Sequence, residues 1–265
     1  MTERSARVVA AAKLLRHAGR KRAGRFLAEG PNLVEAALER GLVIEVFVTE
    51  EAALRHRALL ADLLAGPPAA HPRIPLHAMT ERAAKALSDT VTPPGLVAVC
   101  RPPETDLHRV CAGARLVVVA VGVGEPGNAG TLIRLADAMG AAAVVFAGHS
   151  VDPYNGKCLR ASTGSIFAVP VIVEPDLGLV VDVLHGAGLQ VLATTVDAET
   201  TLGRAGELLT APTAWLFGSE AHGLSPDEAA LADHRVGIEM SGSAESLNVA
   251  SAAAICLYQS ARAQS

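Results

Sequence analysis

The second half of the chain alternates short, continuous apolar runs with segments of helical periodicity, and this pattern restricts the fold more than any other feature of the sequence. Strands that are apolar on both faces are typical of a parallel sheet covered by helices on both sides. We therefore predict an α/β domain built on a parallel sheet. The predicted strands are RLVVVAVGVG (115–124), AAVVFAGH (142–149), FAVPVIV (167–173), LQVLATTVD (189–197), TAWLFGSE (213–220) and HRVGIEM (234–240).

The first half shows a second, smaller α/β pattern, which opens with a predicted helix over residues 5–18. The polar, proline-containing stretch RPPETDLHR follows and predicts a linker. We accordingly expect two domains, 1–105 and 106–265. In the first domain, strands are predicted at 25–30, 43–50, 73–79 and 95–100, and further helices at 32–41, 54–66 and 80–89.

Composition limits the class of protein. The chain has 265 residues, 50% of them hydrophobic and 19% charged, which is enough to bury a core in each domain. No apolar run is as long as a membrane span, and the early stretch VVAAAKLL is interrupted by Lys13 and lacks a cleavage pattern, so we expect a cytoplasmic protein. The four cysteines form no C-x-x-C pair and lie in mainly apolar segments, which favours buried free thiols over disulfides or a zinc site. No metal is expected.

Positive charge is concentrated at the start of the chain. Residues 1–25 contain eight basic side chains against Glu3 alone, although the whole chain has a net charge of −4. Such a cluster favours a phosphate-rich partner, because lysine and arginine displace counterions from nucleic acid, but a solvated amphipathic helix explains it equally well. With only 3% aromatic residues, contact with RNA is expected to be mainly electrostatic. The residues predicted to contact RNA are Arg16, Arg20, Lys21, Arg22 and Arg25.

Three glycines after the first strand of the second half match the dinucleotide-binding pattern G-x-G-x-x-G. They are Gly122, Gly124 and Gly127. The pattern also needs an acid at the end of the next strand to hold a ribose, but Gly148 and His149 stand there. Pro126 removes an amide that could bind phosphate. A dinucleotide-dependent oxidoreductase is therefore kept only as an alternative.

Three polar, glycine-rich loops follow predicted strands: GNAGTLIRLADAMGA (127–141), LFGSEAHGLSP (216–226) and IEMSGSAESLNVA (238–250). Ligands of open α/β sheets bind at the carboxyl ends of the strands, so these loops are expected to form one site. In their order along the chain and in their residues, they resemble the three signature motifs of the SpoU family of RNA ribose 2′-O-methyltransferases, within the SPOUT superfamily. The first half, with FLAEGPNLVEAALERG, resembles that family's N-terminal RNA-recognition domain. The resemblance covers nearly the whole chain.

Individual residues in these loops also suggest a site. On the helix predicted from about Ala129, Arg134 points away from the core stripe, and Asn128 stands at the helix entrance. Gly218 is expected to let the backbone approach a ligand closely, and Glu220 is either a site residue or a cap of the next turn. In the last helix, Ser246 is predicted as the N-cap and Asn248 as a residue inside the helix, where its amide needs a partner.

The resemblance implies a function and a set of site residues. It implies transfer of a methyl group from S-adenosylmethionine to a ribose 2′-hydroxyl of RNA, by a homodimer whose C-terminal domain contains a trefoil knot. The expected catalytic residues are Asn128, Arg134, Glu220, Ser246 and Asn248. The donor's adenosine is expected among backbone groups of Thr195, Gly218, Ile238, Met240 and Leu247.

Two questions stay open at the level of sequence. The family assigns proton removal to Arg134, but arginine remains protonated in proteins, so this residue could instead clamp a phosphate and stabilise the developing alkoxide. The expected substrate is ribosomal (23S) RNA, with transfer RNA as the alternative. A non-catalytic RNA-binding protein is a further alternative, which the intact motif residues argue against.

Overall fold

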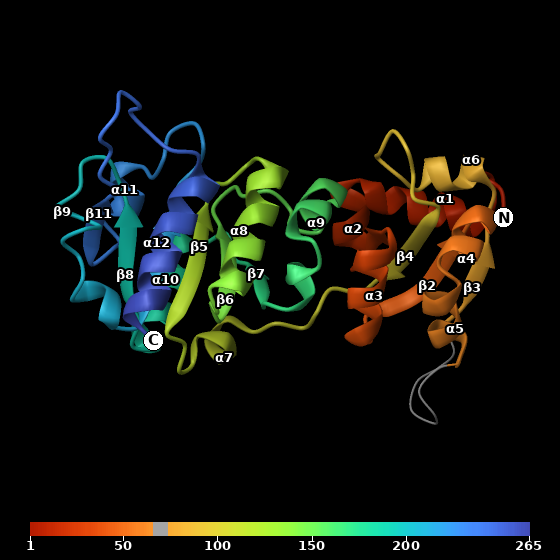
Figure 1. Ribbon diagram of the computed structural model, residues 1–265, viewed down its shortest axis with the longest axis horizontal. Coiled ribbons are helices and arrows are strands. Elements are labelled where there is room, and N and C mark those ends of the chain that lie inside the picture. Colours follow the sequence, from red (N-terminus) through yellow and green to blue (C-terminus); the bar gives the residue numbers. More distant parts are fainter. Residues whose placement is uncertain (66–73) are drawn as a thin grey trace. The chain divides into compact units, whose positions relative to one another are not determined.

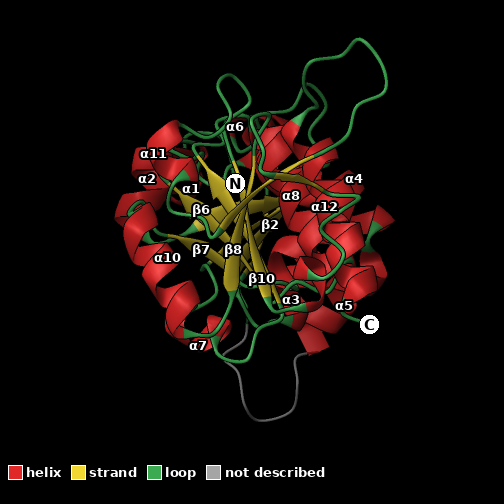
Figure 2. Cartoon of the chain, turned by 90° about the vertical axis from the view of Figure 1, so that its left-hand side faces the viewer, coloured by secondary structure: helices red, strands yellow, loops and turns green. Residues whose placement is uncertain are grey.

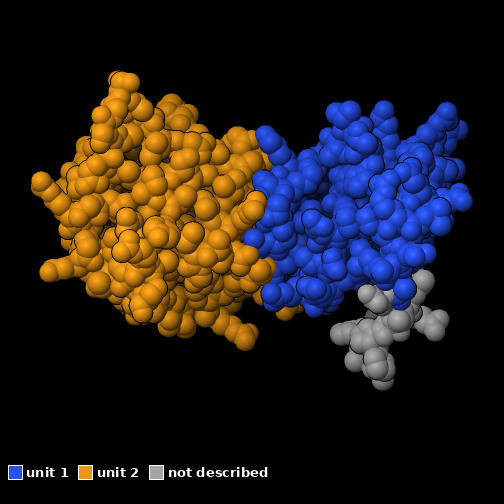
Figure 3. All heavy atoms as spheres, in the orientation of Figure 1, with its two compact units in different colours: residues 1–103, 154–167 blue, residues 104–153, 168–265 orange. Residues whose placement is uncertain are grey.

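The computed structural model describes residues 1–65 and 74–265 (Figure 1). This part of the chain divides into two compact units: residues 1–103 with 154–167, and residues 104–153 with 168–265 (Figure 3). The sequence predicted one boundary, at 105/106. Residues 154–167, which were expected in the second domain, group with the first unit, so the chain passes between the units three times.

The first unit is built on a four-stranded sheet in the order β1-β4-β2-β3. Strand β4 (Leu96–Cys100) is antiparallel to β1 (Phe26–Glu29) and to β2 (Val43–Val48), whereas β3 (Leu76–Ala78) is parallel to β2. Each lies within a predicted strand. The helical elements are α1 (Ala6–Ala12), η1 (Lys13–Leu15), α2 (His17–Ala23), α3 (Pro31–Glu39), α4 (Glu50–Arg55), α5 (Arg57–Ala65), α6 (Glu81–Ala86), α9 (Gly156–Ser162) and η2 (Ser165–Phe167). Gly66 and Arg73, the outer ends of one predicted helix and one predicted strand, lie outside the described residues.

The predicted single helix over 5–18 is wrong in one respect, because the chain turns a corner at Arg16. That residue has an extended backbone (φ −101°, ψ 140°) between η1 and α2. A Cβ added to Gly19 would lie 1.9 Å from the carbonyl oxygen of Lys13, so only glycine permits the two segments to meet this closely. Ala11 and Leu14 are both buried, so the apolar periodicity runs on almost to the corner and hides it in the sequence.

The core of the first unit lies between its sheet and the helices α1, η1 and α6. Val8, Leu14 and Ala83 from these helices pack with Leu27 and Phe47 from the sheet, and all five are buried. This burial of apolar surface is the main stabilisation available to so small a unit.

Residues 154–167 are held in the first unit by aromatic and ionic contacts. The ring of Tyr154 lies 4.8 Å from that of Phe26, measured between centroids. The Arg160 guanidinium is 2.6 Å from the Asp89 carboxylate and 3.5 Å from the Glu29 carboxylate. A segment that lies between two strands of the second unit in sequence is thus tied to the first.

The second unit contains a seven-stranded sheet, parallel throughout, in the order β7-β6-β5-β10-β8-β11-β9. Its strands are β5 (Leu116–Val121), β6 (Ala143–Ala147), β7 (Val171–Val173), β8 (Gln190–Thr194), β9 (Thr200–Thr201), β10 (Thr213–Phe217) and β11 (His234–Gly237). The predicted parallel sheet and α/β class are confirmed, and six of these strands lie within predicted ones. The two-residue β9 was not predicted.

Helices cover both faces of this sheet, which explains why its strands are apolar on both sides. Figure 2 shows α7 (Leu107–Cys111) and α10 (Leu177–Gly186) on one side of the strands, with α8 (Pro126–Ala138) and α12 (Val249–Ala263) on the other. On the α8 and α12 side, the buried Trp215 of β10 donates a hydrogen bond from Nε1 to Ser260 Oγ of α12, 2.9 Å away. The remaining helical elements are α11 (Pro226–Ala229) and η3 (Leu208–Thr210). No helix of the described chain is long and apolar enough to cross a membrane.

Candidate active site at the carboxyl ends of the strands

The three glycine-rich loops meet at one edge of the seven-stranded sheet. They follow β5, β10 and β11, which are parallel, so their carboxyl ends lie at the same edge. Hydrogen bonds join the loops directly: the Asn128 side chain contacts Glu220, 92 residues away, and Asn248, 120 residues away. The three loops therefore meet through these three residues, as the sequence predicted; their role in a site stays a prediction.

Glu220 is the acceptor at the centre of this network. Its carboxylate receives hydrogen bonds from the backbone N–H of Gly124 (3.2 Å), the backbone N–H of Glu125 (3.1 Å) and Asn128 Nδ2 (2.9 Å). Partial burial raises the pKa of the Glu220 carboxyl, but hydrogen bonds from Asn128 and from the backbone outweigh it and hold this pKa below its usual range. Glu220 is therefore ionised at neutral pH and organises the first loop.

These same contacts make the glycine-rich loop unsuitable for a dinucleotide. A pyrophosphate would need the free amides at the start of α8, but the N–H groups of Gly124 and Glu125 already donate to Glu220. Glu125 adds a second carboxylate there, because its side chain accepts from the Asn128 N–H at 2.8 Å as the N-cap of α8. Two negative charges at this helix N-terminus would repel phosphate, which argues against the oxidoreductase alternative.

Asn248 links the third loop to the first and also caps the last helix. Its Nδ2 donates to Asn128 Oδ1 at 3.1 Å, and its Oδ1 accepts from the backbone N–H of Ala250 at 2.9 Å. The prediction that Ser246 is the N-cap and that Asn248 lies inside the helix is wrong, because α12 begins at Val249 with Asn248 as its N-cap. Both residue types are good caps. The first buried residues, Val249 and Ala250, show why the helix starts two positions later than predicted.

The amide groups in this network have one consistent orientation. Asn128 faces a carboxylate, which can only accept, so its nitrogen must point to Glu220 and its oxygen to Asn248. Asn248 must then use its nitrogen toward Asn128 and its oxygen toward its own helix. The three side chains thus form a directed chain of hydrogen bonds that starts from the helix α12 and ends at the carboxylate.

The loop after β10 is a tight turn. Ser219 and Gly223 exchange two backbone hydrogen bonds, of 3.1 and 2.9 Å, which present residues 220–222 at the tip. A Cβ on Gly218 would lie only 2.1 Å from the carbonyl carbon of Gly223. The absence of a side chain at Gly218 is therefore required by this chain's own backbone, and the expectation that it also lets a ligand approach stays a prediction.

The predicted donor-binding residues lie in the same region, in loops or at loop boundaries after β8, β10 and β11. Thr195 is the most informative, because its Oγ1 is the buried side-chain oxygen for which the described residues offer no hydrogen-bond partner. Met240 and Leu247 are large apolar side chains that remain 37% and 39% exposed. A hydroxyl without a partner and two exposed apolar side chains suit a ligand that has both apolar and polar groups.

Arg134 and Ser246 lie outside the hydrogen-bonded network. Arg134 is exposed on α8, between the buried Ile133 and the half-buried Leu135, and its side chain makes no ion pair or hydrogen bond with any residue in 1–65 or 74–265. Ser246 is exposed in the loop before α12. The structure of a single chain thus brings together Asn128, Glu220 and Asn248, and does not bring Arg134 into contact with them.

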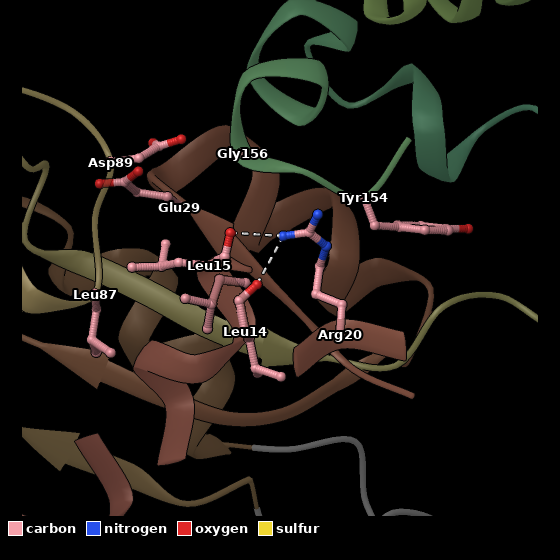
Figure 4. A pocket seen from close by; sticks show the side chains of 9 residues that line it. Leu14, Leu15, Arg20, Glu29, Leu87, Asp89, Tyr154 and Gly156 are labelled. Atoms are coloured by element: carbon pink, nitrogen blue, oxygen red, sulfur yellow. Dashed lines mark hydrogen bonds between the residues drawn. The ribbon is translucent and has the colours of Figure 1, made fainter. Parts of the chain in front are cut away.

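The basic residues of the first unit divide into two groups. Arg20 is only 8% exposed, and its Nη1 donates to the carbonyl oxygens of Leu14 and Leu15, each 3.0 Å away (Figure 4). Its charge therefore stabilises the corner between η1 and α2, and the prediction that Arg20 lies on the RNA-binding surface is wrong. The other predicted members of the cluster are exposed: Arg16, Lys21, Arg22 and Arg25.

The described residues contain no group of three histidine, cysteine or acidic side chains that could hold a metal ion. The four cysteines are buried and free: Cys100, Cys111, Cys158 and Cys256. Burial raises the pKa of Cys256 to about 12, so this thiol stays protonated at neutral pH.

Comparison with known proteins decides the family. The profile of the SpoU rRNA Methylase family matches residues 115–258, which include every loop of the site, and that of the MRM3-like substrate binding domain matches residues 6–98. The chain belongs to the SpoU family. A Bacillus subtilis relative, named 23S rRNA (guanosine(2553)-2′-O)-methyltransferase RlmP, is 36% identical over 240 residues, which cover 90% of this chain and 89% of the relative.

Other SpoU proteins are similarly close. The 23S rRNA (uridine(2479)-2′-O)-methyltransferase of Streptomyces viridochromogenes is 34% identical over 250 residues, 92% of this chain and 84% of that protein. The crystal structure of the SpoU methyltransferase AviRb from the same organism, in complex with the cofactor AdoMet, has a TM-score of 0.84 at 33% identity and covers 97% of this chain and 98% of its own.

One residue that organises this SpoU site was missed at the level of sequence. Glu125 holds the backbone of Asn128 from the N-cap position, while Glu220 holds the same residue by its side chain. The signal was present, because an acid directly before Pro126 is typical of a helix start. The G-x-G-x-x-G pattern of the same loop instead indicated Gly122, Gly124 and Gly127 as its functional residues.

Proposed function

We propose that this chain transfers the methyl group of S-adenosylmethionine to a ribose 2′-hydroxyl of 23S ribosomal RNA. Membership of the SpoU family and the names of its full-length relatives support the reaction and the substrate. The observation in the structure that carries the proposal is the network of Glu220, Asn128 and Asn248, which joins the three family loops at the ligand-binding edge of the sheet.

The residues at this edge fit the methyl donor. The partnerless Thr195 hydroxyl offers a hydrogen bond, and the exposed side chains of Met240 and Leu247 offer apolar surface for an adenosine. In this proposal the backbone groups of Thr195, Gly218, Ile238, Met240 and Leu247 hold the donor. S-adenosylmethionine supplies a methyl group that a positively charged sulfur makes electrophilic, so the chain's residues need only orient the two reactants and assist loss of the hydroxyl proton.

We assign Arg134 to the RNA rather than to proton removal. An arginine side chain is a hydrogen-bond donor without an acceptor, so it is a poor general base, but its planar fork suits a phosphate next to the reacting ribose and the negative charge that develops on the 2′-oxygen. Glu220 is not a free base either, because three N–H groups already use its carboxylate. In this proposal Glu220, Asn128 and Asn248 fix the loops, and Ser246 contacts the substrate from its exposed position.

We further propose that the chain acts as a homodimer. The exposed face of α12 carries Ile255 and Tyr258, which are 38% and 52% exposed, with the small residues Ser251 and Ala254 beside them. A second copy would cover this apolar face. Dimerisation also supplies a reason for the position of Arg134, which can serve the network of the other copy although it does not contact that of its own chain.

The remaining expectations complete the proposal. The exposed basic residues Arg16, Lys21, Arg22 and Arg25 would bind the phosphates of the RNA. The trefoil knot of the C-terminal domain and a cytoplasmic location stay predictions from the resemblance and the sequence.

The experiment that tests this function is a map of 2′-O-methyl groups in RNA from cells with and without the gene. We expect one position in 23S rRNA to lose its methyl group when the gene is absent and to regain it when the wild-type gene is restored. Loss of a methyl group from a transfer RNA instead would establish the alternative substrate. Identical maps, together with no methylation of a 23S transcript by the purified protein, would refute the proposal.

A further inference from the structure

Glu239 joins two loops that contain predicted donor-binding residues. It follows β11 and stands between Ile238 and Met240 in the chain. Its carboxylate accepts hydrogen bonds from the backbone N–H of Gly203, with N–O distances of 3.1 and 3.3 Å to its two oxygens. One carboxylate therefore spans from the loop after β11 to the turn after β9.

Backbone hydrogen bonds join the segment from Thr195 to Leu202 to β11 at several points. The Thr195 N–H lies 3.4 Å from the carbonyl oxygen of Val236, and the Glu199 N–H donates to that of Arg235 at 3.1 Å. Leu202 then donates to the carbonyl oxygen of Gly237 at 2.8 Å. Glu239 adds the last contact in this series, directly beyond the end of the strand. It is thus the point at which the backbone of 238–240 is fixed against the segment that contains the partnerless Thr195 hydroxyl.

The Glu239 carboxylate is exposed, and its neighbours favour its ionised form. The hydrogen bond from Thr201, then those from the backbone, and the positive charge of Arg204 hold the pKa of Glu239 below its usual range. A Cβ added to Gly203 would lie 2.7 Å from Glu239 Oε1, so a side chain at that position would displace the carboxylate. The glycine and the acid are thus matched to each other.

We propose that Glu239 is a positioning residue for the methyl donor, which sets the backbone of Ile238 and Met240 at the distance from Thr195 that donor binding requires. This inference rests on the proposed function. Glu239 acts through the backbone, because its carboxylate is directed to the N–H of Gly203. Its removal is therefore expected to weaken donor binding and to leave the chemical step unchanged once the donor is bound.

Two variants remove the same interaction from opposite sides. Glu239→Gln keeps the shape of the side chain but removes its charge, and Gly203→Ala places a methyl group where the carboxylate lies. The exposed Glu207, which lies close to Gly203 in sequence and whose side chain forms no ion pair with the described residues, gives the matched control Glu207→Gln. Hydrogen bonds to ionised groups are stronger than neutral ones, so we expect about a fivefold to tenfold rise in the Kd for S-adenosylmethionine in each test variant.

The measurements are calorimetric titration of the full chain with S-adenosylmethionine, and methylation of a 23S transcript over a range of donor concentrations. Both test variants should raise the Kd and the donor KM while kcat at saturating donor stays within about twofold of wild type. The variant with both substitutions should have a Kd for S-adenosylmethionine no higher than the higher of the two single-variant Kd values, because both changes remove the same interaction. Glu207→Gln should bind as wild type does.

Three results would overturn the inference. Wild-type Kd values in both test variants would show that the interaction does not position the donor, without affecting the proposed function. Multiplicative effects in the double variant would show that the two residues act independently. Absence of donor binding by the wild-type chain itself would overturn the proposed function and this inference together.

Discussion

Asn248 has two roles, so different substitutions at this position are predicted to change the stability of the chain and its rate of methyl transfer independently. Asn248 caps α12 with its Oδ1 and donates to Asn128 with its Nδ2. Asn248→Ala removes both hydrogen bonds. Loss of a helix cap costs about 1 kcal/mol of unfolding free energy, and loss of a hydrogen bond at an exposed position adds up to about 1 kcal/mol. We therefore expect Asn248→Ala to lower the free energy of unfolding by about 1–2 kcal/mol, or roughly 2–4 °C in Tm for each kcal/mol.

Asn248→Asp separates the two hydrogen bonds. Aspartate is as good an N-cap as asparagine, so the helix should keep its stability to within about 0.5 kcal/mol. The aspartate cannot donate to Asn128 Oδ1, and its charge would face that oxygen instead. If the network orients the family loops for methyl transfer, the single-turnover rate should fall about tenfold or more, which corresponds to a loss of about 1.4 kcal/mol in the transition state.

Ser246→Ala is the matched control for capping, because Ser246 is exposed two residues before Asn248. Its free energy of unfolding in urea should stay within about 0.5 kcal/mol of wild type. The assays are urea unfolding followed by circular dichroism and single-turnover methylation of a 23S transcript at saturating donor. Equal destabilisation by Ser246→Ala and Asn248→Ala would refute the position of the cap, and a wild-type rate in Asn248→Asp would refute the role of the network.

Further predictions follow from the charged residues. Arg134→Ala should leave the free energy of unfolding within about 0.5 kcal/mol of wild type but abolish single-turnover methylation. Arg134→Lys should retain part of the methylation rate, because lysine keeps the charge. A wild-type rate in Arg134→Ala would show that this residue does not belong to the site. Replacing the exposed basic residues with alanine should weaken RNA binding and reduce the log–log salt slope by about 0.7 to 0.9 for each phosphate that is no longer neutralised, as filter binding at several salt concentrations would show. Arg20→Ala should instead lower the free energy of unfolding in urea, by roughly 2 kcal/mol, because it orphans two carbonyl oxygens. The pKa of Glu220 in the folded chain lies below its ordinary value of 4.5, so the ionised Glu220 contributes fully to stability above pH 4.5. This contribution is lost as the pH falls through the pKa of the folded chain. In the Glu220→Gln variant, the urea midpoint should therefore fall less steeply than in wild type below about pH 4.5.

The architecture of the second unit could be predicted because its strands carry the signal themselves. Runs such as Leu116–Val121 are apolar at every position, which only a sheet covered on both faces explains. Strand β9 could not be found in this way, since it consists of two threonines and exists only because β11 lies beside it. Short polar edge strands are set by their neighbours and not by their own sequence.

The errors in the site have a common cause, which is that the partners of a side chain, near or far in the chain, do not appear in local patterns of residue type. Arg20 looks like an exposed basic residue because arginine usually is one, but its partners are carbonyl oxygens at a corner that periodicity does not reveal. Arg160 ties residues 154–167 to the first unit through Glu29, 131 residues earlier in the chain. Ser246 and Asn248 are equally good caps, so only the packing of the next two residues decides between them.

The charge at the start of α8 explains how a glycine-rich loop at this edge can serve a ligand other than a dinucleotide. In a dinucleotide site the helix N-terminus offers free amides to a pyrophosphate. Here Glu125 and Glu220 occupy the amide and side-chain donors of that terminus, so the loop presents negative charge. S-adenosylmethionine has no phosphate and carries a positive sulfur, so it suits such an edge. In the proposed function, the phosphates of the RNA would instead bind Arg134 and the exposed basic residues of the first unit. The two carboxylates that disfavour a dinucleotide are therefore compatible with the proposed arrangement, in which the donor binds at the strand ends and arginine and lysine side chains hold the RNA backbone.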